Sequence, residues 1–260
     1  MKKENDKNIL LAAGGTGGHL YGAESLASEL SLRGFNPFLF TDKRVGHLVK
    51  GLIQGNVKEI FSATFTNTSF YKWPFVVFKI LLGFISSLIL IKKIKPKAVV
   101  GFGGYPTIPV IFAAKVCGLK IIIHEQNIIL GRANKLLIKL ADIISLGFEN
   151  TVGVPKNYRK KVYFSGNPIR KDILKYQNPY QALTENDKFK LVIFGGSQGA
   201  SFFSKTIPPS LGMLSNKKKS FLKVFHQVRL EEVEYIKNFY NSEGIDAEVS
   251  NFFYELPMLL

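Results

Sequence analysis

The feature that most constrains the fold is a unit that occurs three times along the chain. In each unit a short apolar run (residues 9–13, 98–101 and 191–194) leads into a glycine-rich turn and then into a stretch with helical character. Apolar runs of this length are typical of buried strands, and glycine permits the tight turn that follows. Strands that alternate with helices indicate a parallel sheet covered on both faces by right-handed crossovers. The sequence therefore predicts a doubly wound α/β fold.

The glycine turns also predict where a ligand binds. In such sheets ligands lie beyond the carboxyl ends of the strands, and the N–H groups at a helix start favour phosphate. We therefore expect the turns to converge on a cleft that binds a diphosphate. The alternative is that the turns need glycine only for their conformation, which explains one turn more easily than three. Neither the G-x-G-x-x-G spacing of dinucleotide-binding proteins nor the Walker spacing is present.

A domain boundary is expected near the segment SGNP at residues 165–168, which follows a short apolar run and precedes a polar stretch. We expect one domain over residues 1–165 and a second over residues 166–260. The second is long enough for only about half of a nucleotide-binding domain, and the chain ends on apolar residues. The sequence thus predicts a second domain that is incomplete.

The net charge of the chain excludes some classes of binding partner but leaves several open. Lys and Arg number 35 against 19 Asp and Glu, which gives a formal net charge of +16 and favours polyanionic partners. A phosphorylated substrate and an anionic membrane surface both fit, although a lysine-rich composition also arises without any binding role. No nucleic-acid-reading motif accompanies the charge, so no nucleic-acid partner is expected. Cys117 is the only cysteine, which excludes an internal disulfide, and the absence of an export signal indicates a reducing cytoplasm.

The apolar stretch at residues 75–91, FVVFKILLGFISSLILI, allows three interpretations. A core helix packed on the sheet is the first expectation, because Lys79, Ser86 and Ser87 recur along one helical stripe. An interfacial helix in the lipid boundary, with the neighbouring lysines on headgroups, is the second. A membrane span is the least supported, since the stretch is short of the roughly 20 apolar residues that a spanning helix requires.

Two residues are candidates for catalysis. His19 lies where the first glycine turn becomes a helix, so the helix dipole favours the neutral imidazole that a general base requires, although a lone histidine is usually structural. Glu125 belongs to the polar cluster HEQN just past a predicted strand, where it either takes part in catalysis or braces the loop. No metal-ligand spacing is present, so backbone dipoles would stabilise a leaving diphosphate.

Five segments occur in an order that resembles the MurG family of bacterial peptidoglycan glycosyltransferases: GGTGGH at 14–19, GFGGYPTIP at 101–109, HEQN at 124–127, GNPIR at 166–170 and GGSQGA at 195–200. The resemblance implies the GT-B architecture, in which two Rossmann-like domains face each other across a cleft. It also implies transfer of N-acetylglucosamine from UDP-N-acetylglucosamine to the 4-hydroxyl of lipid I. The product would be lipid II for cell-wall synthesis, with inversion at the anomeric carbon.

The resemblance also assigns roles to single residues. It makes His19 the base that deprotonates the acceptor hydroxyl and places Tyr105 in a loop facing the acceptor diphosphate. It implies no cofactor and no metal. The partners would be the donor, lipid I and an anionic membrane, with the protein peripheral at the cytoplasmic face of the inner membrane. The implied donor ligands are Thr16, Gly17, Gly18, Asn127, Arg170 and Ser197, with a backbone contact from Phe253 to uracil.

The chain departs from the family pattern at its end. Family members normally continue through a further glycine-containing donor loop, an acidic residue for the ribose and a closing helix. Two readings follow: an enzyme of the lipid II pathway, or a non-catalytic membrane-binding remnant that has lost donor binding. A nicotinamide-dependent oxidoreductase is disfavoured by the glycine spacing.

Overall fold

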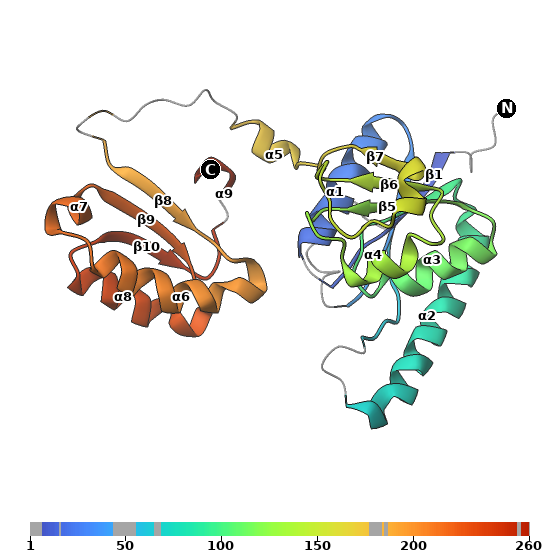
Figure 1. Cartoon of the computed structure of the whole chain (residues 1–260), viewed down its shortest axis with the longest axis horizontal. Coiled ribbons are helices and arrows are strands. Elements are labelled where there is room, and N and C mark those ends of the chain that lie inside the picture. Colours follow the sequence, from blue (N-terminus) through green and yellow to red (C-terminus); the bar gives the residue numbers. More distant parts are fainter. Residues whose placement is uncertain are drawn as a thin grey trace. The chain divides into compact units, whose positions relative to one another are not determined.

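A computed structural model describes residues 7–15, 17–43, 56–64, 69–176, 184, 187–253 and 256–259 of the chain (Figure 1). The chain divides into two compact units, Met1–Arg170 and Lys171–Leu260. Each unit is described by itself. Thr16, one of the predicted donor ligands, lies outside the described residues.

The described part of the first unit forms one parallel sheet of seven strands in the order β3-β2-β1-β4-β5-β6-β7. The strand order reverses between β1 and β4, which is where open α/β sheets bind ligands. Because all strands run the same way, the segments that follow them meet at one edge. The strands are β1 Asn8–Ala12, β2 Asn36–Thr41, β3 Val57–Glu59, β4 Ala98–Gly101, β5 Lys120–Glu125, β6 Ile143–Leu146 and β7 Val162–Phe164.

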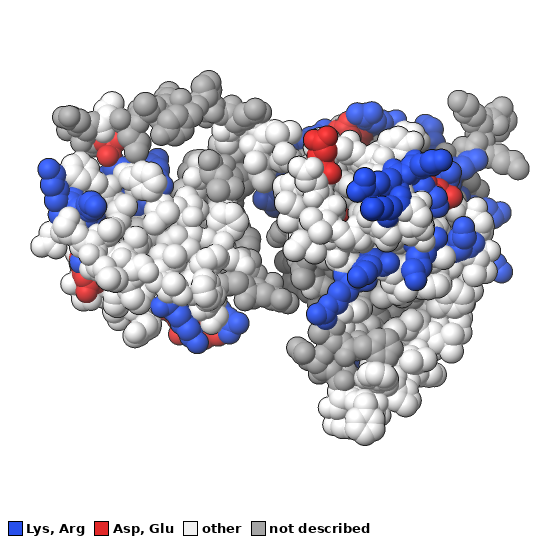
Figure 2. All heavy atoms as spheres, in the orientation of Figure 1, with Lys and Arg blue, Asp and Glu red and all other residues white. Residues whose placement is uncertain are grey.

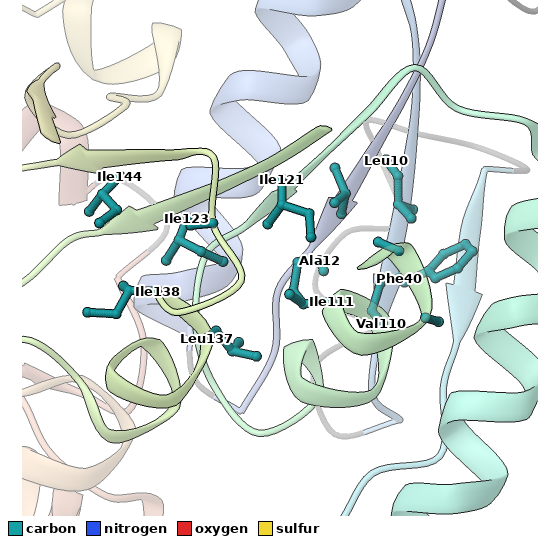
Figure 3. Packing of buried hydrophobic residues seen from close by; sticks show 14 of the residues in the cluster. Leu10, Ala12, Phe40, Val110, Ile111, Ile121, Ile123, Leu137, Ile138 and Ile144 are labelled. Carbon is teal, nitrogen blue, oxygen red and sulfur yellow. The ribbon is translucent and has the colours of Figure 1, made fainter. Parts of the chain in front are cut away.

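Helices cover both faces of this sheet. Side chains alternate along β1, so that Leu10 and Leu11 lie in separate apolar clusters. The cluster with Leu10 packs against three helices and is drawn in Figure 3, whereas the cluster with Leu11 packs, among the described helices, against α1. The predicted doubly wound arrangement is confirmed. The helices are α1 Gly17–Leu32, α2 Trp73–Ile94, α3 Thr107–Val116 and α4 Arg132–Leu137, with short 3-10 turns η3 Phe70–Lys72 and η4 Lys156–Lys161.

The long helix α2 is packed against the first unit on one side. The fully buried residues are Val76, Gly83, Ser87 and Ile91, and they lie against α3 and the backbone at Phe61. A Cβ atom at Gly83 would overlap the Phe61 carbonyl oxygen, so glycine is required there. Further apolar side chains of α2 are partly buried against the core, whereas those on the outer side are exposed. The helix therefore packs as a core helix on its inner side only.

The second unit contains a smaller parallel sheet in the order β10-β9-β8. Its core is formed by Val224, Ile236 and Tyr240 among others, and it repeats the order of β3-β2-β1 in the first unit. The elements are β8 Phe189–Ile193, β9 Leu222–Gln227, β10 Asp246–Ser250, α5 Lys171–Leu174, α6 Gly196–Gly212, α7 Asn216–Ser220, η5 Leu230–Glu232, α8 Val233–Ser242 and α9 Leu256–Leu259.

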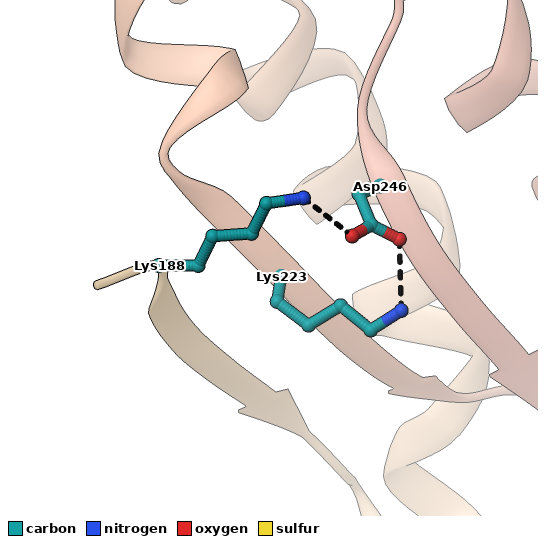
Figure 4. A network of polar contacts seen from close by, with 3 residues as sticks. All are labelled: Lys188, Lys223 and Asp246. Atoms are coloured by element: carbon teal, nitrogen blue, oxygen red, sulfur yellow. Dashed lines mark hydrogen bonds and ion pairs between the residues drawn. The ribbon is translucent and has the colours of Figure 1, made fainter. Parts of the chain in front are cut away.

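An ion-pair network joins the amino ends of these three strands. Asp246 accepts hydrogen bonds from Lys188 Nζ at 2.7 Å and Lys223 Nζ at 2.8 Å (Figure 4). Those two ammonium groups lower the pKa of the Asp246 carboxyl. All three side chains are at least partly exposed, so the network adds little to stability. It lies at the edge opposite to the glycine turn that follows β8.

Candidate active site

The glycine turns after β1 and β4 touch each other. A Cβ atom at Gly104 would overlap the carbonyl oxygen of Gly14, and one at Gly14 would lie 2.7 Å from Pro106 Cγ. Gly103 and Gly104 also have φ values of +91° and +81°, a backbone region that favours glycine. The predicted convergence is thus observed for these two turns, and both turns require glycine. The third turn belongs to the second unit.

A cavity of about 220 Å³ opens beside the turn after β4. Within the described residues, no group of three or more His, Cys, Asp and Glu side chains is placed to hold a metal ion. The polar side chains that line the cavity include an imidazole, a phenol, an amide, a carboxylate and the guanidinium of Arg132. The lining residues are His19, Gly103, Gly104, Tyr105, Glu125, Gly131, Arg132, Ala133 and Asn134.

His19 is in the first turn of α1, which begins at Gly17 and so starts earlier than the sequence indicated. Its Nδ1 atom lies 3.2 Å from Gln126 Oε1. A Cβ atom at Gly103 would lie 3.3 Å from His19 Cε1, and one at Gly104 would lie 3.5 Å from its Cδ2. The imidazole therefore packs directly against the turn after β4.

Glu125 holds the loop between β5 and α4 in place. Its side chain is buried, with 1% of the residue exposed, and its two oxygens accept four hydrogen bonds. Oε1 accepts from the N and Nδ2 atoms of Asn127, both at 2.9 Å, and Oε2 accepts from Gly131 N at 2.8 Å and Asn134 Nδ2 at 2.9 Å. This is the bracing arrangement that the sequence left open. A catalytic role for Glu125 stays a prediction.

Three amide side chains that had no predicted role complete the site. Gln126 Nε2 donates to the Phe102 carbonyl oxygen at 2.9 Å, and Asn167 Nδ2 donates to the Gln126 carbonyl oxygen at 3.1 Å. Asn134 Nδ2 also donates to the His124 carbonyl oxygen at 3.0 Å, and its Oδ1 is buried without a partner among the described residues. Gln126 and Asn167 belong to the HEQN and GNPIR segments singled out in the sequence, whereas Asn134 had no signal there.

His124 is an internal part of the site. It packs edge-on against Phe102 with 5.3 Å between ring centroids, and its Nδ1 lies 3.3 Å from Ser145 Oγ. Burial lowers the pKa of the His124 imidazole and outweighs the opposing effect of its hydrogen bonds and of Glu125. His124 is therefore neutral at pH 7 and supports the strand end.

Two of the predicted donor ligands of the first unit, Gly17 and Arg170, meet at the ring of Tyr21. The Arg170 guanidinium lies 5.0 Å from the centre of the Tyr21 ring, a cation-π contact. A Cβ atom at Gly17 would lie 3.2 Å from Tyr21 Cε2, which places Arg170 and the start of α1 on the same aromatic ring. Gly18 follows in the first turn of α1, and Asn127 is exposed while bonded to Glu125.

Two further predicted ligands belong to the second unit. Ser197 is in the first turn of α6, although its side chain is outside the described part of the structure. Phe253 is 8% exposed and packs edge-on against Phe225 with 6.2 Å between ring centroids. The contacts of both residues with a donor stay predictions.

Comparison with known proteins identifies the sequence relatives. Residues 9–145 match the glycosyltransferase family 28 N-terminal domain, and residues 190–260 match the family's C-terminal domain. A protein of Brucella abortus (strain S19) is 40% identical over 257 residues and is called UDP-N-acetylglucosamine--N-acetylmuramyl-(pentapeptide) pyrophosphoryl-undecaprenol N-acetylglucosamine transferase. The match covers 97% of this chain and 66% of that relative. The chain thus spans just under two thirds of the relative's length.

Solved structures show the same fold. MurG of Acinetobacter baumannii has a TM-score of 0.69 at 25% identity, over 97% of this chain and 68% of that one. A calicheamicin glycosyltransferase has a TM-score of 0.60 at 14% identity, over 97% and 72% of the two chains, and shows the fold alone. The predicted α/β fold class with GT-B relatives is confirmed. Because the first domain match covers more than half of the residues and both domains occur in order, the chain belongs to glycosyltransferase family 28.

Proposed function

We propose that this protein transfers N-acetylglucosamine from UDP-N-acetylglucosamine to lipid I and so produces lipid II. The observation that carries the proposal is His19, which lines a cavity beside the glycine turn after β4, and this turn touches the glycine turn after β1. The 40% identity to the Brucella transferase supports the choice of substrates. The roles of the single residues are part of the proposal.

The reaction is a single displacement. His19 takes the proton of the acceptor hydroxyl as that oxygen bonds to the anomeric carbon, and the bond from this carbon to the UDP oxygen breaks with its electrons on UDP. Attack from the face opposite to UDP inverts the anomeric carbon. N–H groups at the start of α1, near Gly17 and Gly18, stabilise the departing negative charge. This chemistry needs no cofactor.

The remaining predicted residues bind or position the substrates. Arg170 provides a positive charge beside Gly17, and Tyr105 lines the cavity proposed for the acceptor diphosphate. Glu125 acts through Asn127 by holding this residue toward the donor, because its own oxygens are occupied. Ser197 and Phe253, in the second unit, are donor ligands in this proposal. We assign acceptor binding to residues 1–165, which also contribute the donor ligands Gly17, Gly18 and Asn127, and the remaining donor ligands to residues 166–260.

The proposal also includes a membrane surface as a partner, and α2 supports it. The residues that face the protein include the small Gly83 and Ser87, and Ser87 Oγ donates to the Gly83 carbonyl oxygen at 2.7 Å. In Figure 2 the visible face of α2, at the lower right, is nearly free of charged atoms. The outer side of a helix in a water-soluble protein normally carries polar residues, and on α2 it is largely apolar. The exposed apolar residues include Phe70, Tyr71, Trp73, Phe75, Val77, Phe78, Leu81, Leu82, Ile85 and Ile89.

The position of lysines on α2 favours the lipid boundary. By length and composition, one helix in the described part of the chain, Phe70–Ile94, could cross a membrane. However, α2 packs along its length against the rest of the unit, so only its outer side is open to lipid. Lys79 Nζ lies 4.5 Å from the Phe75 ring centre, where it can reach anionic headgroups. We place the protein peripherally at the cytoplasmic face of the inner membrane.

A transfer assay tests the proposed reaction. The 260-residue chain is incubated with radiolabelled UDP-N-acetylglucosamine and lipid I in phosphatidylglycerol-containing vesicles, and lipid II is measured. We expect product from the wild type and a decrease of about 100-fold or more for His19→Ala, because general bases contribute rate factors of that size. Ser25→Ala is the matched control, since Ser25 is on the same helix and, within the described part of the chain, its hydroxyl donates to the Tyr21 carbonyl oxygen.

The same assay distinguishes an active enzyme of the lipid II pathway from a non-catalytic membrane-binding remnant. No product from the wild type under conditions in which the Acinetobacter enzyme is active would contradict the proposed reaction. Calorimetric titration with UDP-N-acetylglucosamine then measures donor binding, and vesicle flotation measures membrane binding. Vesicle binding without donor binding would support the membrane-binding remnant.

A further inference from the structure

We propose that Gln126 is a positioning residue that fixes the tautomer of His19, with the proton on Nδ1 and the lone pair on Nε2. The catalytic meaning of this inference rests on the proposed function. The tautomer itself does not, because it follows from the hydrogen bonds around the Gln126 side chain. Those bonds fix the orientation of the amide.

The orientation follows from the Phe102 carbonyl. The Gln126 amide lies between this carbonyl oxygen, at 2.9 Å, and His19 Nδ1, at 3.2 Å. A carbonyl oxygen can only accept a hydrogen bond, so the amide NH₂ group must face Phe102. The amide oxygen then faces His19 and can only accept as well. Nδ1 must therefore carry the proton.

The Gln126 amide is held by its surroundings. Asn167 Nδ2 donates to the Gln126 backbone oxygen, and the four bonds of Glu125 fix the neighbouring loop. At Gly22 the backbone of α1 lies close to both Phe102 and Gln126. A Cβ atom there would lie 3.2 Å from the Phe102 ring and 3.9 Å from Gln126 Nε2. A rotated amide would place its NH₂ group against His19 and its oxygen against the Phe102 carbonyl oxygen. That arrangement loses a hydrogen bond and sets two acceptors against each other.

The free nitrogen is the one needed for proton transfer. Cε1 and Cδ2 of His19, the two carbons that flank Nε2, lie against the Gly103–Gly104 turn that lines the cavity. Within the described residues Gln126 is the hydrogen-bond partner of the imidazole, so Nε2 remains available to an acceptor hydroxyl. Gln126 supplies orientation through a neutral amide, without the charge that a carboxylate partner would add. A histidine held in the wrong tautomer presents N–H instead of a lone pair and cannot act as base.

Nitrogen NMR tests the tautomer directly. The protein is labelled with ¹⁵N-histidine, and the His19 signals are assigned as those that disappear in His19→Ala. At a pH where His19 is neutral, we expect the proton on Nδ1 in the wild type and a loss of this preference in Gln126→Leu. Ser25→Ala should keep the wild-type pattern. A wild-type proton on Nε2, or an unchanged tautomer in Gln126→Leu, would overturn the inference.

A second variant protects the test against misfolding. Gln126→Glu can still accept the Nδ1 proton, although it has no N–H group for the Phe102 carbonyl oxygen. We expect its His19 proton to stay on Nδ1, and a proton on Nε2 would contradict the inference even if Gln126→Leu does not fold. Thermal unfolding of both variants shows whether each is folded.

Kinetics connect the tautomer with the reaction. We expect Gln126→Leu to lower kcat by roughly twofold or more but by less than the about 100-fold of His19→Ala, because part of the imidazole still has its lone pair on Nε2, while KM for UDP-N-acetylglucosamine stays within about twofold. A KM that rises as strongly as kcat falls would instead indicate a general structural role and count against positioning. If the NMR result holds but the wild type makes no lipid II, the proposed function fails and the tautomer assignment stands.

Discussion

Replacing Glu125 by glutamine tests whether this carboxylate orders the loop or reacts with substrate. The side chain keeps its shape, but an NH₂ group takes the place of one oxygen. Each oxygen faces two N–H donors, from Asn127 on one side and from Gly131 and Asn134 on the other. Whichever way the new amide turns, two of the four hydrogen bonds are lost and donors face donors.

The cost follows from the lost hydrogen bonds. A hydrogen bond to a charged group contributes about 1.5 to 3 kcal/mol, so two lost bonds cost about 3 to 6 kcal/mol. Asn127 is exposed and water can replace its partner, which favours the lower end of this range. We expect the first unit to lose about 3 kcal/mol of its free energy of unfolding. A domain has about 5 to 15 kcal/mol in total, so Glu125→Gln should fold with a Tm lowered by roughly 6 to 12 °C.

Circular dichroism melting and native-state hydrogen exchange measure the effect. The amide proton that faces the new NH₂ group, that of Asn127 or that of Gly131, should exchange faster in Glu125→Gln, because it loses its acceptor. Glu149→Gln is the control, since Glu149 is exposed in the loop after β6 and should change stability by less than about 0.5 kcal/mol. The loop-ordering role would be refuted if Glu125→Gln has the Tm of the wild type and equally slow amide exchange, yet no longer transfers N-acetylglucosamine.

Three further predictions concern pH, membrane binding and packing. Burial lowers the pKa of His226 to about 4, so as the pH falls the unfolded chain binds a proton on this residue before the folded chain does. The second unit should therefore lose about 3 kcal/mol of its free energy of unfolding between pH 6.5 and pH 4. Urea unfolding at a series of pH values measures this loss, and a free energy that does not change with pH would contradict it. Phe78→Ser should weaken flotation with anionic vesicles by about tenfold or more while Phe221→Ser, also exposed, should not, and equal effects would exclude α2 as the contact. Gly83→Ala should lower the stability of the first unit by about 1 to 3 kcal/mol, because the new methyl group meets the Phe61 carbonyl oxygen, and an unchanged Tm would show that α2 is not fixed at this point.

The fold was largely predictable because burial on both faces leaves a strong mark on the sequence. The apolar runs that form β1 and β4 are short, continuous and followed by glycine. Few structures other than a buried parallel strand with a tight turn after it require this combination. The α2 helix was the exception. Its serines and lysine mark a stripe, but periodicity alone does not say which side of a helix faces the protein. Gly83 and Ser87 face inward because the backbone at Phe61 comes so close.

The site was predictable where local sequence carries the chemistry. His19 and Glu125 are in glycine-rich or polar segments at strand ends, so their place at one edge of the sheet followed from the fold. The partner of Gln126 is a carbonyl 24 residues earlier in the chain, on a neighbouring strand. Asn134 bonds backward to β5 from within a helix, and Arg170 stacks on Tyr21 from the far end of the unit. Such contacts depend on tertiary packing, and no sequence spacing indicates them.

The contact at Gly83 that fixes α2 to the rest of the first unit also determines how the helix responds when lipid replaces water around it. A Cβ atom at Gly83 would lie 3.3 Å from the Pro109 side chain as well as against Phe61, so the joint depends on close atomic contact and on the absence of a side chain. Small residues that allow such contact hold helices together inside bilayers, where water is not available to drive association. A joint of this kind keeps its strength when lipid replaces water around it. If the outer side of α2 enters the lipid boundary, as proposed above, this contact keeps the helix attached to the domain that carries the glycine turns.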